Sequence, residues 1–126
     1  MRYAYCKEGF RYREYCYWMP ESLFYSDLFF DVSLEACALY AYLLHAQAIA
    51  GRTDKKGYRY LRYEKGSLSR ITKKSEEETR ALLTSLSEEG YGLIKACEEE
   101  GATRIYVKDY TRPILPPRAK RRLGRY

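Results

Sequence analysis

The sequence predicts an α+β protein, mainly α, built as a winged helix-turn-helix with a C-terminal β-hairpin wing. Three observations predict this fold: a long apolar helical run over 34–50, a well-capped helix that begins at residue 76 behind a shorter helical segment, and two β-leaning runs after it. In a winged helix-turn-helix the second helix of the pair usually enters the major groove of DNA. The chain of 126 residues is long enough for one such domain, which we place at 19–110.

The N-terminal part precedes this domain. Residues 1–18 alternate aromatic and charged side chains, a pattern that favours an extended arm over a helix. Pro20 then suits the first turn of a short leading helix. We expect that helix to carry Leu23 and Phe24 inward.

The helix over 34–50 has a clear start and a clear stop. Ser33 stands at the N-cap position and Gly51 follows the last helical residue. Because the helix is apolar on nearly every face, we expect its own domain and a second copy of the chain to cover it. The residues expected at this homodimer interface are Leu39, Tyr42, Leu43 and Ala46. The single histidine, His45, is interpreted as a packed or interface side chain, because no acid or nucleophile motif accompanies it.

The segment that follows contains a loop, a strand and a short helix. Residues 52–57 are polar and basic, and 58–63 alternate as a short strand with arginines on one side. Ser67 can cap a short helix that carries Leu68 and Ile71 inward, and 72–74 form a turn.

The next helix has the most distinct capping signal. Ser75 and Glu78 form a capping box ahead of a helix over 76–89, which Gly90 ends. Its buried face is expected to hold Thr79, Leu82, Leu83 and Leu86, and its outer face Glu77, Arg80, Thr84 and Ser87.

The wing and the tail complete the chain. Residues 93–97 and 103–107 are β-leaning runs joined by 98–101, which predicts a hairpin. Residues 111–126 hold three prolines and a basic cluster, expected to form a tail. Phosphate contact and a merely solubilising role both remain open for this tail.

Composition excludes several function classes. The formal net charge is +6, yet 52–74 and 101–126 carry +7 each while 75–100 carry −6. The four cysteines include no C-x-x-C pair and there is one histidine, so neither a metal site nor a cofactor is expected. No signal-peptide or membrane-spanning pattern is found, and a reduced, cytoplasmic protein fits best. We expect no enzyme, because no phosphate-binding loop, nucleophile elbow or carboxylate pair is present.

Four strings of residues in this order resemble the N-terminal domain of plasmid replication initiator A proteins, which is related to the winged helix of DnaD-type primosomal proteins. These strings are Tyr17–Phe24, Leu34–Leu44, Gly90–Ile94 and Arg104–Tyr110. The resemblance implies binding to origin DNA as a dimer or higher oligomer, with host replication proteins recruited through regions beyond this domain. Because about 16 residues follow Tyr110, we expect a regulator or a shortened relative of such initiators.

The candidate contacts to double-stranded DNA are basic or hydroxyl side chains on the strand, the helix pair, the wing and the tail. They are Arg59, Arg62, Arg70, Lys73, Lys74, Arg80, Thr84, Lys95, Arg104, Arg118, Lys120, Arg121 and Arg122. The loop and strand add Arg52, Lys55, Lys56 and Lys65, for which a solvated basic loop is the alternative. Arg80 has two interpretations: it contacts a base, or it forms an ion pair with Glu76 or Glu77 on its own helix.

Two further alternatives remain open. The acidic start of the helix, Glu76–Glu78, and the acidic wing tip, Glu98–Glu100, favour a protein-interaction module that binds a basic partner. Tyr58, Tyr60 and Tyr63 alternate with arginines, which suits either cross-strand packing or the stacking of unpaired bases.

Overall fold

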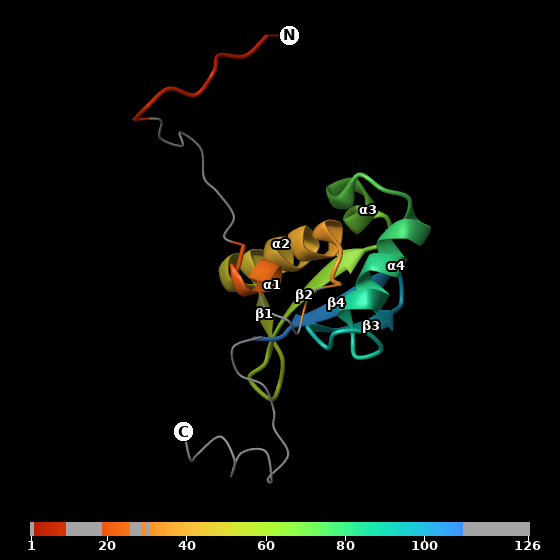
Figure 1. Ribbon diagram of the computed structural model, residues 1–126. Helices are drawn as coiled ribbons and strands as arrows, with labels where there is room; N and C mark the ends of the chain where they lie inside the picture. The colour runs from red at the N-terminus through yellow and green to blue at the C-terminus, as the bar shows by residue number, and fades with distance from the viewer. Residues whose placement is uncertain (1, 10–18, 26–28, 30, 110–126) are drawn as a thin grey trace, which may run out of the picture.

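The computed structural model describes residues 2–9, 19–25, 29 and 31–109, and it confirms the winged helix-turn-helix (Figure 1). Two of the helices, α2 and α4, flank strands β2 and β4, while α3 lies near the end of β2. The helices are α1 (Ser22–Tyr25), α2 (Leu34–Ala50), α3 (Ser67–Thr72) and α4 (Glu76–Leu86). The strands are β1 (Arg52–Thr53), β2 (Arg59–Glu64), β3 (Ile94–Glu99) and β4 (Ala102–Val107).

The four strands form one antiparallel sheet in the order β1-β2-β4-β3. The wing is the hairpin of β3 and β4, whose pairing runs from Ile94 opposite Val107 to Glu99 opposite Ala102. Side chains alternate between the two faces of a strand, so Leu61, Ile94 and Ile105 share the face that is turned to the helices. All three are buried, which places the core between this face and α2 and α4.

Helix α2 is fixed to the sheet by polar contacts as well as by packing. Its N-cap Ser33 accepts a hydrogen bond from the Ala36 amide at 3.1 Å. The Gln47 side chain donates to the carbonyl of Val107 at 3.1 Å and accepts from its amide at 2.9 Å. The Tyr40 hydroxyl donates to the Lys108 carbonyl at 2.7 Å, so α2 is joined to the end of β4.

Several local expectations need correction. Phe24 is 49% exposed and Ile71 is 36% exposed, because the short helices α1 and α3 each bury a single leucine, Leu23 and Leu68. The N-cap of α3 is Gly66, at φ 86°, and not Ser67. A left-handed backbone of this kind favours glycine, because a Cβ there is strained.

The end of α4 and the first strand also differ from the sequence-based expectation. Helix α4 ends at Leu86, not at residue 89, because the Ser87 amide donates to the carbonyls of both Leu83 and Thr84 and closes the last turn. Gly90 lies in the following turn, where a Cβ would collide with the carbonyl oxygen of Ser85. Residues 52–57 were expected as a loop, yet Arg52 and Thr53 pair with β2 as the short strand β1.

The residues expected at a dimer interface divide into two pairs. Leu39 and Leu43 are 4% and 0% exposed, because this chain's own core covers them, and they are core residues rather than a surface for a second copy. Tyr42 and Ala46 are half-buried against the same core. A dimer interface at Tyr42 and Ala46 stays a prediction.

Some expectations fall on residues outside the described ranges. Of the arm at 1–18, residues 2–9 are exposed and form neither helix nor strand, and the rest lies outside. The tail at 111–126 lies outside entirely. Among the described residues, no helix is both long and apolar enough to span a membrane, and no cluster of metal-ligating side chains is found.

Candidate nucleic-acid interface

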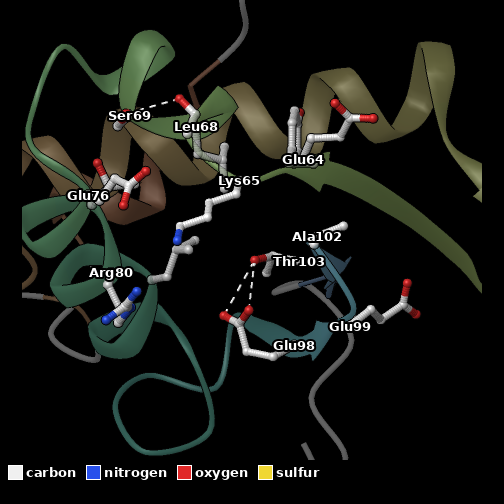
Figure 2. Close-up of a pocket in the computed structure, with 15 residues that line it drawn as sticks. Glu64, Lys65, Leu68, Ser69, Glu76, Arg80, Glu98, Glu99, Ala102 and Thr103 are labelled. Carbon is white, nitrogen blue, oxygen red and sulfur yellow. Dashed lines mark hydrogen bonds between the residues drawn. The ribbon is translucent and has the colours of Figure 1, made fainter.

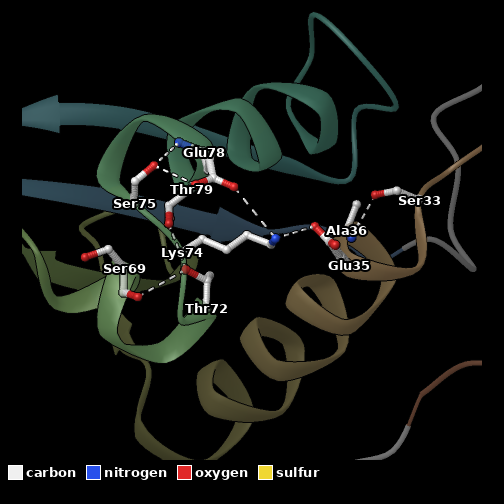
Figure 3. A network of polar contacts seen from close by, with 9 residues as sticks. All are labelled: Ser33, Glu35, Ala36, Ser69, Thr72, Lys74, Ser75, Glu78 and Thr79. Carbon is white, nitrogen blue, oxygen red and sulfur yellow. Dashed lines mark hydrogen bonds and ion pairs between the residues drawn. The ribbon is translucent and has the colours of Figure 1, made fainter.

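The helix-turn-helix of α3 and α4 is held together by short side-chain contacts (Figure 3). The hydroxyls of Thr72 and Thr79 lie 2.7 Å apart, and Thr79 is only 4% exposed. Ser75 forms the expected capping box: its hydroxyl accepts from the Glu78 amide at 3.1 Å and donates to the Glu78 carboxylate at 3.0 Å. The turn between the two helices therefore has a defined geometry.

Lys74 fastens this turn to α2. Its ammonium lies 3.1 Å from the Glu35 carboxylate, in the first turn of α2, and 3.8 Å from that of Glu78. Figure 3 shows the amino group between the two carboxylates. The hydrogen bond to Glu35 is the largest cause that raises the pKa of Lys74, so the side chain stays charged. Lys74 was expected to contact DNA, but the structure engages it inside the domain.

Other basic side chains near the turn are exposed. Arg70 lies on α3, and Lys73 follows that helix with φ 61°. On α4, Arg80 and Thr84 are exposed, which confirms their predicted position on the outer face. Within the described part of the chain, no ion pair or hydrogen bond engages the side chains of Arg70, Lys73 and Arg80.

A pocket of about 290 Å³ lies between the start of α4, the β2–α3 turn and the tip of the wing (Figure 2). Lys65 reaches into it from the turn, Arg80 and Glu76 line it from α4, and Glu98 lines it from the wing. The Lys65 amide donates to the carbonyl of Gly101 at 3.1 Å, which ties the turn to the wing tip. A charged ligand would therefore meet cations and carboxylates together in this pocket.

Four more candidate contacts lie on the sheet, and three of them are engaged. The Arg59 guanidinium donates to the carbonyls of Ala48 and Gly51 at the end of α2, at 3.5 and 3.2 Å. Glu99 pairs with Arg62 at 3.4 Å and with Arg104 at 2.6 Å. Lys95 is exposed on β3.

The structure thus separates the sequence-predicted residues. Arg70, Lys73, Arg80 and Thr84 gather on the helix pair, whereas Arg62, Lys95 and Arg104 share the sheet face that is turned away from α2 and α4. The predicted contacts Arg118, Lys120, Arg121 and Arg122 lie outside the described residues. The sequence placed Lys65 with the basic loop and strand, but in the structure it lines the pocket. It lies there beside the tight turn at Gly66, whose φ is 86°, and the sequence alone did not predict this turn.

Comparisons with known proteins agree with this geometry. The family model of the replication initiator protein A (RepA) N-terminus matches residues 15–116. A solved structure described as a Rep–DNA complex is 19% identical, with a TM-score of 0.66, over 97% of this chain and 94% of that chain. A second, described as the N-terminal domain of a DNA-binding protein, is 19% identical, with a TM-score of 0.65, over 98% of this chain and 95% of that chain. No curated protein matches the chain.

Proposed function

The chain belongs to the family of replication initiator protein A N-termini, and from this premise we propose that it binds double-stranded origin DNA without catalysing a reaction. It would act in plasmid replication, as an initiator or as a control factor. The observation that carries the proposal is the set of unpaired cations around the helix pair: Lys65, Arg70, Lys73 and Arg80.

The geometry of these cations suits a duplex. Arg70 and Lys73 stand on α3 and just after it, so they meet the phosphate backbone beside the groove that α4 enters. Arg80 and Thr84, on the exposed face of α4, are then the side chains that reach base edges. A similar fold occurs in the protein whose structure is described as a Rep–DNA complex, which supports the same use of the fold here.

Two of the acidic residues near the site already form hydrogen bonds or ion pairs within the domain. Glu78 is engaged by Ser75 and Lys74, and Glu99 by Arg62 and Arg104. These carboxylates stabilise the domain itself, which weakens the case for a surface that binds a basic protein. Glu76 and Glu77 remain exposed at the start of α4 and oppose phosphate there.

The wider assignment is also a proposal. We place the DNA-binding domain at 19–110, between an extended arm at 1–18 and a basic tail at 111–126. The tail would add phosphate contacts through Arg118, Lys120, Arg121 and Arg122. The protein would act in the cytoplasm as a homodimer, with Tyr42 and Ala46 at the interface, and it would meet host replication proteins at the origin.

Fluorescence anisotropy with a labelled random-sequence duplex tests the proposed surface. The double variant Arg70→Gln/Lys73→Gln should weaken duplex binding by about tenfold, because it removes two phosphate contacts. The matched control, Lys55→Gln/Lys56→Gln, makes the same change of charge in the β1–β2 loop, at the other end of β2 (Figure 1). Equal losses in both variants would show that net charge, and not this surface, binds the duplex.

A further inference from the structure

The sheet has a second face, turned away from α2 and α4, which we name the outer sheet face. The strand pairing places alternate residues on it, whereas the buried Leu61, Ile94 and Ile105 lie on the opposite face. The outer sheet face is formed by Arg52, Tyr60, Arg62, Glu64, Lys95, Cys97, Glu99, Ala102, Arg104 and Tyr106.

One row of this face crosses all four strands. Arg52 on β1 pairs with Tyr60 on β2, and Lys95 on β3 pairs with Tyr106 on β4. The two tyrosine rings meet in the middle, with centroids 5.6 Å apart and planes inclined by 46°. The row therefore reads cation, ring, ring, cation, and at the usual strand spacing it is about 15 Å long.

The rings at the centre of the row are held in place. The Tyr106 hydroxyl donates to the Asp54 carboxylate at 3.0 Å, in the loop between β1 and β2. The Arg104 guanidinium lies over the Tyr60 ring, with its carbon 4.2 Å from the ring centroid. Both tyrosines are half-buried, so part of each side chain is accessible from solvent. Such rings need little ordering before a flat ligand stacks on them.

The charge of the outer sheet face favours an anion. Its strand residues include four cations and two carboxylates, and Asp54 adds a third carboxylate beside Tyr106. One of the three, Glu99, is engaged by Arg62 and Arg104. Arg52 and Lys95, at the two ends of the row, are exposed and form no ion pair in the described ranges, and Glu88 lies close enough to Lys95 for the two charges to interact. The row thus combines a central aromatic surface with an exposed cation at each end.

We propose that this row binds single-stranded DNA. Unpaired bases would stack on the surface made by Tyr60, Tyr106 and the Arg104 guanidinium, while Arg52 and Lys95 hold phosphates on either side. A duplex does not fit this chemistry, because its bases are already stacked on one another. The choice of DNA over RNA rests on the proposed function, in which the chain acts at an origin whose strands must separate.

This surface is distinct from the proposed duplex surface. Helix α4 packs on the inner side of the sheet and its Arg80 lines the pocket at the wing tip, whereas the row crosses the sheet at the other end of the β3–β4 hairpin. A duplex held by α3 and α4 therefore leaves the outer sheet face free for a strand.

Anisotropy of the full chain with labelled oligothymidine and with labelled duplex tests the proposal. The double variant Arg52→Gln/Lys95→Gln should weaken oligothymidine binding by about tenfold and reduce its salt slope by about 1.4, with duplex binding unchanged. The matched double variant Arg70→Gln/Lys73→Gln should do the reverse. Failure of the duplex arm alone would count against the proposed function, whereas failure of the oligothymidine arm alone would count against the row.

A second measurement does not depend on variants. An oligonucleotide that carries 5-bromodeoxyuridine should crosslink under ultraviolet light to the peptides that contain Tyr60 and Tyr106, and excess duplex should not prevent it. Crosslinks confined to α4, competition by duplex, or tighter binding of oligouridine than of oligothymidine would each overturn the assignment to single-stranded DNA.

Discussion

Tyr91 connects the segment before α2 to the turn that follows α4. Its hydroxyl donates to the Asp31 carboxylate, and its ring lies against Phe29 with centroids 6.2 Å apart. The hydrogen bond to Asp31, followed by burial, raises the pKa of Tyr91 from 10.0 to about 12. The phenol must keep its proton to donate, so this contact stabilises the fold only while Tyr91 is neutral.

The sign of the resulting pH dependence follows from the raised pKa. The stabilisation is fully present below the unfolded pKa of 10.0 and is lost as the pH rises through about 12. Tyr91→Phe should therefore lower the Tm at neutral pH. The difference in Tm between this variant and the unmodified protein should become smaller as the pH rises above 10.0. Thermal melts followed by circular dichroism across this pH range measure the difference in Tm.

Tyr58 is 63% exposed, so Tyr58→Phe is the control and should have the Tm of the unmodified protein at every pH. A difference in Tm for Tyr91→Phe that stays constant with pH would contradict this role of Tyr91.

At this same scale, the sequence predicted the candidate DNA contacts only in part. The free cations Arg70 and Lys73 were predicted as contacts, and so were Lys74 and Arg62, which are engaged by carboxylates. The partner of Arg62 is Glu99, and their meeting depends on how β2, β4 and β3 pair. The charge pattern of one segment does not predict an ion-pair partner that lies on a strand distant in the sequence.

Among the elements, the capping box of α4 has the most direct effect on stability. The hydroxyl of Ser75 satisfies the amide of Glu78, which has no partner within the helix. Ser75→Ala should lower the free energy of unfolding by about 1 kcal/mol, measured by urea denaturation. Thr84→Ala, on the exposed face of the same helix, should leave the midpoint unchanged or raise it slightly. A Ser75→Ala midpoint equal to that of the unmodified protein would mean that tertiary packing alone holds the start of α4.

The elements with strong local signals were also those the sequence predicted best. Helix α2, the start of α4 and the wing hairpin were all expected, because a side-chain cap or a long apolar period marks each of them. Strand β1 was not predicted, because two residues are too few to show the alternation of side chains that marks a strand. Its pairing with β2 defines it as a strand. The N-cap of α3 was misplaced by one residue because Ser67 has the favoured side chain, whereas Gly66 has the required backbone.

On the scale of the whole molecule, charge is divided among surfaces with different tasks. The unpaired cations Lys65, Arg70, Lys73 and Arg80 lie on the side of the helix pair, together with the carboxylates of Glu76 and Glu77. The outer sheet face, which is turned away from α2 and α4, holds Arg52 and Lys95. The net charge of +6 therefore does not describe what any one ligand meets.

This division leads to a prediction for salt dependence. If four cations contact phosphates, duplex affinity should fall by about 100-fold between 50 and 200 mM salt. Glu76→Gln/Glu77→Gln adds no phosphate contact, so it should tighten duplex binding at every salt concentration and leave the slope the same. Anisotropy titrations over this range measure both quantities, with Glu21→Gln/Glu89→Gln, two exposed carboxylates outside α4, as the matched control for charge. A slope near zero would exclude these cations as the contact surface. Weaker duplex binding of the Glu76→Gln/Glu77→Gln variant would mean that the start of α4 does not face the phosphates, because a carboxylate beside phosphate can only oppose it.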